Sequence, residues 1–277
     1  MHSFSVVPFA DMDATTAYSF QRCKILHLVR HGQGIHNVEG EKGNHVLLSE
    51  ELLDAQLSPL GWQQVDNLRK QVQSCGLAKT IDLVITSPMS RTLQTALGVF
   101  GSEEITNGFD VDSSMAANGE NGGPCAKSTF NCPPIVAVEL CRERLVCLMI
   151  SFSLLKSCST IVQIESEDDN LWKADTREPF DEVAARGINF INWLWTRQEK
   201  EIAVVSHGIF LQQTLTALFH PSLDEKLCTR FQNCEVRSVV IVDRSTMGSC
   251  NPGQISNVIY LPSNVSKENI TREEVSK

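Results

Sequence analysis

The sequence predicts an α/β fold of three layers, in which helices cover both faces of a mostly parallel central sheet. Nearly continuous apolar runs, which are typical of buried strands, alternate with segments whose apolar residues recur at helical spacing. The alternation extends from about residue 24 to about residue 243 of the 277 residues. Alternating strands and helices favour a parallel sheet covered on both sides. The pattern does not give the order of the strands.

The first strand and the first helix carry clear signals. Lys24–Val29 is almost wholly apolar and ends at residues 30–32, a natural exit from a strand into a loop. Ser58 suits the N-cap of a helix, and Pro59 suits its first position. Gly76 can end that helix. Its apolar residues share one face: Trp62, Val65, Leu68 and Val72.

The remaining elements follow the same alternation. Further strands are expected at Ile81–Ile85, Ile135–Leu140, Ile202–Val205 and Val236–Val242. Further helices are expected at Ser90–Val99, Phe180–Arg197 and Ile209–Phe219.

We expect residues 1–277 to form a single domain, because no internal repeat and no linker divides the chain. Its core is expected to span about residues 24–243. Residues 101–134 contain several Asn-Gly pairs and a Gly-Gly-Pro sequence, so a long loop is expected there. The polar residues 263–277 are expected to form a loose tail.

The composition limits the binding partners and the cellular compartment that we expect for this protein. The net charge of -9 and the pI of about 5.3 argue against nucleic acid or an anionic membrane as the main partner. The ten cysteines are scattered without a Cys-x-x-Cys pair, so a zinc site is not expected. Residues 1–22 lack the pattern of a secretory leader, and the apolar run 145–155 is too short for a bilayer. We therefore expect a cytoplasmic protein with reduced thiols; the oligomeric state is left open.

Several phosphate-binding side chains follow the ends of predicted strands. Arg30 and His31 end the first strand, Asn37 lies a short loop beyond it, Arg91 begins a helix, and His207 follows the strand at 202–205. Ligands of open α/β sheets bind at this edge. Guanidinium groups match phosphate oxygens, and imidazole can attack phosphorus or donate a proton. The sequence therefore indicates a site for a phosphoryl group.

Four motifs in order resemble the histidine phosphatase (phosphoglycerate mutase-like) superfamily, and in particular its plant phosphoglycerate mutase-like proteins. The first is RHGQGIHN at residues 30–37, and the third and fourth are SPMSRTLQTA at residues 87–96 and VVSHG at residues 204–208. The second, LSPLG at residues 57–61, lies between the motifs at 30–37 and 87–96 and is similar to the helix start that usually stands there. Glu139 falls where members of the family keep an acidic proton donor. The resemblance covers roughly residues 24–243 and implies the fold of that family.

The resemblance also implies a role for each matching residue. His31 would be the nucleophile and must be neutral to attack phosphorus, while Arg30 and Arg91 would hold the phosphoryl oxygens. His207 would stabilise the charge of the transition state, and Asn37 would do the same with its amide. The catalytic set would be completed by Glu139, which would protonate the leaving oxygen and then activate water, with Glu143 as a rival donor. No metal and no cofactor is implied. The other histidines are expected to be structural or exposed: His27, His36, His45 and His220.

Two departures from the family pattern bear on function. The apolar stretch at residues 145–163 replaces a polar segment with further basic residues, and Gln33-Gly34 stands where mutases carry Glu-Ser. Both weigh against a true mutase, which must retain a bisphosphorylated intermediate. We therefore expect a metal-independent phosphatase for small phosphorylated metabolites. Mutase-type phosphoryl transfer in carbohydrate metabolism and a catalytically weak module that binds phosphate remain alternatives.

Overall fold

The computed structural model describes seven segments of the chain. They are residues 23–42, 54–101, 132–144, 162–164, 177–218, 227–242 and 258–261. The predicted loop at 101–134, the altered stretch at 145–163 and the tail at 263–277 lie almost entirely outside the described residues, so they remain predictions.

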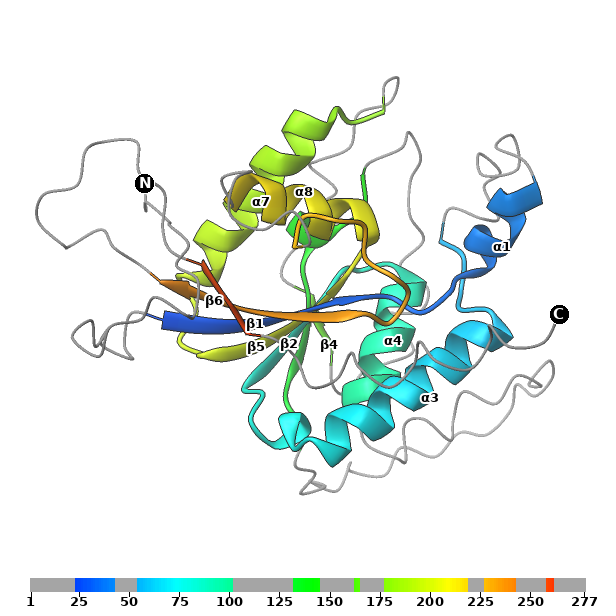
Figure 1. Ribbon diagram of the computed structural model, residues 1–277, viewed down its shortest axis with the longest axis horizontal. Coiled ribbons are helices and arrows are strands. Elements are labelled where there is room, and N and C mark those ends of the chain that lie inside the picture. The colour runs from blue at the N-terminus through cyan, green and yellow to red at the C-terminus, as the bar shows by residue number, and fades with distance from the viewer. Residues whose placement is uncertain are drawn as a thin grey trace, which may run out of the picture.

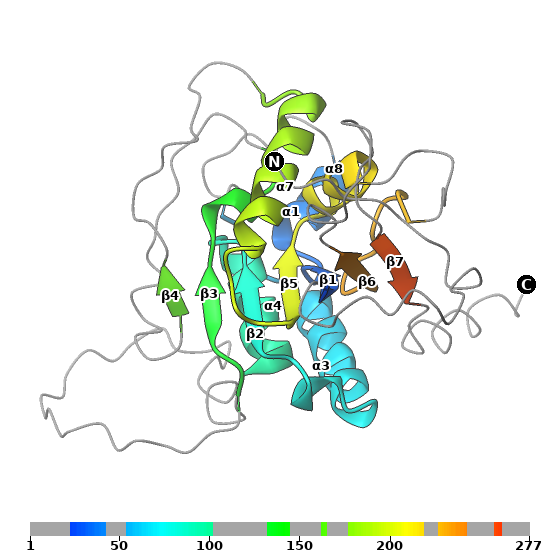
Figure 2. The ribbon, with the colours of Figure 1, turned by 90° about the vertical axis from the view of Figure 1, so that its left-hand side faces the viewer.

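A seven-stranded sheet in the order β4-β3-β2-β5-β1-β6-β7 forms the centre of the molecule (Figures 1 and 2). Five strands on one side of this order pair in parallel, and β6 and β7 add antiparallel pairs at the other side. The predicted mostly parallel sheet is therefore confirmed. The strands are β1 (Cys23–Arg30), β2 (Leu83–Thr86), β3 (Ile135–Ala137), β4 (Val162–Ile164), β5 (Glu201–Ser206), β6 (Val236–Val242) and β7 (Val258–Leu261).

Helices cover both faces of the sheet, as Figure 1 shows. The pair α7 (Phe180–Leu194) and α8 (Gly208–Leu218) packs on one face. The pair α3 (Pro59–Ser74) and α4 (Ser90–Phe100) packs on the other. Each pair buries its apolar residues against one face of the central strands, and so produces the three layers that the alternation of elements predicts. The short helix α1 (Ile35–Lys42) stands beside the sheet (Figure 1).

The register of the parallel strands brings separate motifs to one edge of the sheet. Arg30, the last residue of β1, pairs with Ser206, the last residue of β5. Thr86, which ends β2, pairs with Val205 of β5. The residues that follow these strands, among them His31 and His207, therefore emerge side by side at the carboxyl edge.

The start of α3 is fastened to the loop after β1. Ser58 caps α3 by accepting a hydrogen bond from Gly61 N at 3.0 Å, as its sequence position predicts. Its hydroxyl also donates to Gln33 Oε1 at 2.6 Å, and its backbone N–H donates to Gln33 O at 2.8 Å. Gly61 permits this approach, because a Cβ there would collide with the backbone of Gln33.

The structure differs from the sequence predictions at several places. The strand expected at Ile135–Leu140 ends at Ala137, and a 3-10 turn, η5 (Glu139–Cys141), follows it. The helix expected to reach Arg197 ends at Leu194. The elements α1, β4 and β7 were not predicted. Within the part of the chain that the structure describes, no helix is both long enough and apolar enough to span a membrane.

Candidate active site

His31 lies at the exit of β1 and is only 2% exposed. Its Nδ1 atom is 2.6 Å from the carbonyl oxygen of Gly32. A carbonyl oxygen can only accept, so Nδ1 carries the proton and Nε2 keeps its lone pair. This tautomer leaves His31 with a nucleophilic nitrogen.

The surroundings of His31 keep its ring neutral. Burial lowers the pKa of His31 well below its usual value, and the charge of Arg91 lowers it further. His36 and Arg30 act in the same direction, and the hydrogen bond to Gly32 only partly opposes them. The imidazole is therefore uncharged at neutral pH, the state that nucleophilic attack requires.

His207 lies directly after β5 and is fully buried. Its ring centroid is 5.2 Å from that of His31, in an edge-on arrangement. Arg91 Nη2 donates to His207 Nδ1 at 3.3 Å, so Nε2 carries the proton and donates to Ser87 Oγ at 2.8 Å. Burial and the charge of Arg91 lower the pKa of His207 well below its usual value.

Two buried arginines flank the histidines. Arg91 lies in the first turn of α4, and burial lowers its pKa to about 10, which leaves it charged at neutral pH. Arg30 ends β1, and its Nη1 donates to Phe231 O at 2.7 Å. Burial, aided by the charge of Arg230, lowers the pKa of Arg30 as well. Two cations held in place beside an uncharged imidazole match the charge and the hydrogen-bonding pattern of phosphoryl oxygens.

The loop that precedes β6 is hydrogen-bonded to the backbone at the end of β1. Asn233 Nδ2 donates to His31 O at 3.0 Å, and Cys234 N donates to Arg30 O at 3.0 Å. Cys234 adopts a φ of 56°, which is uncommon for a residue with a side chain. These contacts fix the backbone of both site residues.

Asn37 lies in α1, and its amide oxygen fastens the turn before that helix. Its Oδ1 accepts from Gly34 N at 3.0 Å, and its backbone N–H donates to Gly34 O at 2.9 Å. The structure thus gives Asn37 a local structural contact, and its role toward phosphate stays a prediction.

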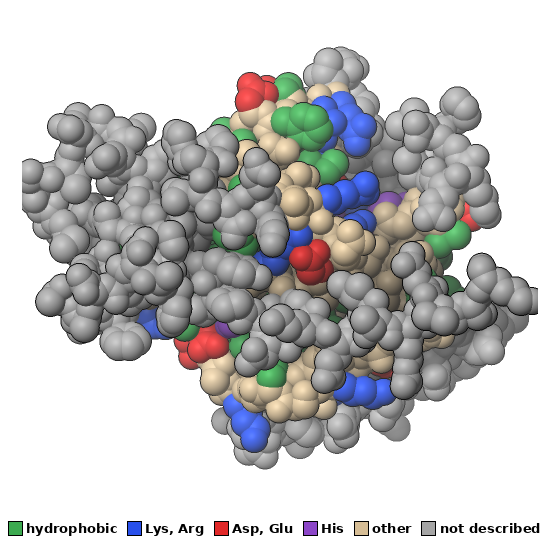
Figure 3. All heavy atoms as spheres, in the orientation of Figure 1, with side chains coloured by type: hydrophobic (Ala, Val, Ile, Leu, Met, Phe, Trp, Pro, Cys, Tyr) green, Lys and Arg blue, Asp and Glu red, His purple; other side chains and the backbone are tan. Residues whose placement is uncertain are grey.

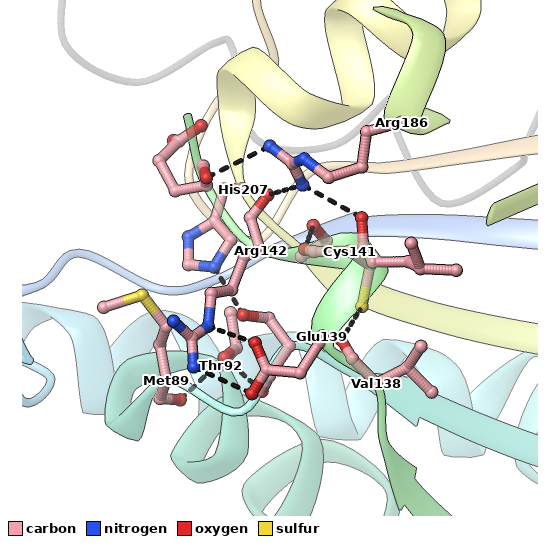
Figure 4. A network of polar contacts seen from close by, with 12 residues as sticks. Met89, Thr92, Val138, Glu139, Cys141, Arg142, Arg186 and His207 are labelled. Carbon is pink, nitrogen blue, oxygen red and sulfur yellow. Dashed lines mark hydrogen bonds and ion pairs between the residues drawn. The ribbon is translucent and has the colours of Figure 1, made fainter. Parts of the chain in front are cut away.

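Glu139 and Glu143 differ in their partners. Both carboxylate oxygens of Glu139 contact the guanidinium of Arg142, at 2.7 Å for Oε1 and 2.6 Å for Oε2, as the paired dashed lines in Figure 4 show. Glu143 instead raises the pKa of both Arg30 and Arg91, so its charge acts on the arginines that flank the site histidines. Glu143 Oε1 also accepts from Arg144 N at 2.9 Å.

A buried arginine on α7, which the sequence did not single out, organises the loop that carries both glutamates (Figure 4). Arg186 donates to the carbonyl oxygens of Leu140 at 2.9 Å, Arg142 at 2.8 Å and Glu143 at 3.3 Å. Its other contacts form a bidentate pair with Glu178, at 2.9 and 2.7 Å. The loop is therefore clamped to α7.

Arg186 was missed because a single arginine within an amphipathic helix resembles an ordinary surface residue. A second tie comes from β5, where Ser206 Oγ donates to Cys141 O at 2.6 Å. This serine immediately precedes His207, so the loop that carries Glu139 and Glu143 is hydrogen-bonded to the strand that positions a site histidine.

Figure 3 shows basic side chains and a histidine together at the surface between the α7–α8 pair and α1. Among the residues that the structure describes, no group of three or more His, Cys, Asp and Glu side chains could hold a metal ion. Arg30, Arg91, His31 and His207 bring guanidinium and imidazole groups together at the site. This cluster, at the carboxyl edge of a parallel sheet, defines an α/β protein that handles phosphoryl groups.

Comparison with known proteins gives the family. The chain matches the Histidine phosphatase superfamily (branch 1) over residues 26–107 and 158–247. The chain belongs to this superfamily, and it is an enzyme of phosphoryl transfer or hydrolysis.

Two plant proteins are similar over most of their length. Phosphoglycerate mutase-like protein 1 of Arabidopsis thaliana is 51% identical over 261 residues, which cover 89% of this chain and 93% of that protein. A second Arabidopsis thaliana phosphoglycerate mutase-like protein is 45% identical, with 91% and 99% covered. Among solved structures, the α-ribazole phosphatase from Shigella flexneri aligns with a TM-score of 0.48 and 18% identity over 78% of this chain and 89% of that one.

Proposed function

We propose that this enzyme is a metal-independent phosphatase that cleaves phosphate monoesters through a phosphohistidine at His31. The observation that carries the proposal is the state of the His31 ring, which is buried, neutral and protonated on Nδ1 beside two guanidinium groups. Phosphoryl transfer depends mainly on positioning and on stabilising charge, and these side chains supply both.

The reaction proceeds in two displacements. The Nε2 lone pair of His31 attacks phosphorus, the N–P bond forms, and the bond to the leaving oxygen breaks. Arg30 and Arg91 balance the charge on the transferring oxygens. A carboxylic acid gives its proton to the leaving oxygen and, as a carboxylate, then takes a proton from water. The water oxygen attacks phosphorus, the N–P bond breaks, and inorganic phosphate leaves.

Because Arg142 engages the carboxylate of Glu139, we propose Glu143 as the acid and base. One charge-assisted hydrogen bond, from Arg142 Nη2 to Oε1, and the ion-pair contact of Arg142 Nε with Oε2 stabilise the carboxylate form of Glu139 over its protonated form. Glu143 acts electrostatically on the two arginines that would hold the phosphoryl group. Protonation of the leaving oxygen is therefore proposed for Glu143, with Glu139 positioning Arg142.

Hydrolysis of p-nitrophenyl phosphate in the presence of a chelator tests the proposal. The wild-type enzyme should release p-nitrophenol at an undiminished rate in chelator, and His31→Ala should release none while keeping its circular dichroism spectrum. Activity that depends on added metal, or that persists in His31→Ala, would refute the mechanism.

The natural substrate is proposed to be a small phosphorylated metabolite in the cytoplasm, bound without nucleic acid or membrane. The acidic net charge of -9 supports a local basic site over a broad basic surface. The names of the plant relatives favour a second candidate, mutase-type transfer in carbohydrate metabolism. Exchange of phosphate between the positions of phosphoglycerate, followed by NMR, would detect that activity.

A further inference from the structure

A third histidine lies against the site. His36 is the second residue of α1, and its ring centroid is 5.6 Å from that of His31, with the rings inclined by 51°. This separation is close to the 5.2 Å between His31 and His207. The sequence predicts a structural or exposed role for His36, but the structure places its ring beside the proposed nucleophile.

His36 also has an unused polar atom. Its Nδ1 is buried and has no hydrogen-bond partner among the described residues. By contrast, Nδ1 of His31 contacts Gly32 O, and both nitrogens of His207 contact neighbouring side chains. A buried polar atom without a partner is unfavourable, and in native proteins such atoms often mark a functional site or a missing ligand.

Gly34 allows the ring to lie in this position. A Cβ at Gly34 would overlap Nδ1 and Cε1 of His36 and would lie 3.4 Å from Cδ of Arg91. The absence of a side chain at Gly34 thus lets the ring of His36 lie against the backbone of Gly34, next to the side chain of Arg91. This glycine is one of the two residues, with Gln33, that replace the Glu-Ser of mutases in the first motif.

The charges around His36 are positive when no anion is bound. Burial lowers the pKa of His36 to about 3, and the charges of Arg91 and Arg30 contribute to this shift. His31 and His207 are electrostatically coupled to it, and Glu143 acts on both arginines. Asp54 also raises the pKa of Arg91, so both Glu143 and Asp54 are acidic groups that act on these arginines. A phosphoryl dianion would add further negative charge beside the ring and would therefore favour its protonated form.

We propose that His36 is a further phosphate-binding residue, which takes up a proton when a dianionic phosphoryl group enters the site and hydrogen-bonds to it. The inference rests on the proposed function, since it deepens the description of the same site. The proton comes from solvent and returns to solvent when the ligand leaves, so no bond to phosphorus is involved. His36 thus makes affinity for the dianion depend on pH.

Sulfate is the probe, because it stays a dianion between pH 5.5 and pH 8 and cannot be hydrolysed. Isothermal titration calorimetry in two buffers of different ionisation enthalpy measures the protons that each sulfate brings in. The wild type should take up about one more proton than His36→Gln, and its affinity should rise more steeply as the pH falls. His36→Phe, which keeps a ring but no donor, should bind sulfate about tenfold more weakly at pH 6.

Ile35→Ala is the matched control, because Ile35 is the neighbouring residue on α1 and its side chain is 42% exposed. It should bind sulfate as the wild type does. Equal affinity and equal proton uptake in wild type and His36→Gln would overturn the proposal. If these variants also turn over p-nitrophenyl phosphate normally, only the assignment of His36 falls. If sulfate binding depends on His36 but the wild type shows no turnover, only the proposed function falls.

Discussion

Arg142 contacts both carboxylate oxygens of Glu139, at 2.7 and 2.6 Å. A glutamate held in this way is stabilised as the anion, although its side chain is only 15% exposed. Residue 139, where the resemblance places a proton donor, is therefore a carboxylate paired with Arg142, while the charge of the neighbouring Glu143 raises the pKa of Arg30 and Arg91.

The two glutamates should differ in their dependence on the leaving group. Glu143→Gln should slow hydrolysis of an alkyl phosphate such as glycerol 2-phosphate by about 100-fold or more, because an alkoxide needs a proton to leave. Its effect on p-nitrophenyl phosphate, whose leaving group is a weak base, should be much smaller. Glu139→Gln should slow both substrates by a similar factor. Steady-state kinetics on the two substrates check this, and a leaving-group effect confined to Glu139→Gln would reverse the assignment.

Removing Arg186 should destabilise the fold, because the buried carboxylate of Glu178 would lose both hydrogen bonds that it accepts from Arg186. We expect Arg186→Met to lower the free energy of unfolding by about 3–5 kcal/mol. The double variant Arg186→Met/Glu178→Gln should recover part of that loss. Urea denaturation of the two variants measures the difference, and equal stabilities would contradict the pairing.

Stability should fall as the pH drops below about 6.5. The site histidines have a folded-state pKa below the unfolded value, so the unfolded chain binds more protons in this range. Their contribution is complete above the unfolded pKa and is lost as the pH falls, for His36 down to about 3. Each group adds at most about 1.4 kcal/mol per pH unit.

Thermal melts of the wild type between pH 5 and pH 7.5 check this dependence. The melting temperature should decrease toward pH 5, and His36→Gln should show a shallower decrease. Identical pH profiles for the two proteins would show that His36 titrates alike in the folded and unfolded states.

Much of the fold could be predicted from local patterns. The first strand was predicted to within a residue at each end, Val236–Val242 was predicted at its observed bounds, and the cap at Ser58 forms as expected. Short buried strands and helix caps depend on residues that are close in sequence, so they can be predicted from a single sequence. The end of β3 was missed because Val138 and Leu140 continue its apolar pattern, while the turn at Glu139 is stabilised by Arg186, which lies far along the chain.

The site could be predicted only where it follows strand ends. Arg30, His31 and His207 lie at the carboxyl edge, and the rule for parallel sheets brings them together with Arg91. The positions of His36 and Arg186 depend on how α1 and α7 pack, which no local spacing reveals. The partner of Glu139 was also missed, because the sequence of the turn that holds it continues the apolar pattern of a strand.

The proposed phosphohistidine at His31 is tested most directly by identifying the residue that is phosphorylated during turnover. The enzyme is mixed with p-nitrophenyl phosphate in chelator, quenched in alkali, which preserves phosphohistidine, and digested for mass spectrometry. We expect phosphate on His31 in the wild type and none in His31→Ala, which should also release no p-nitrophenol. Phosphate on another residue, or undiminished turnover in His31→Ala, would contradict the proposed mechanism.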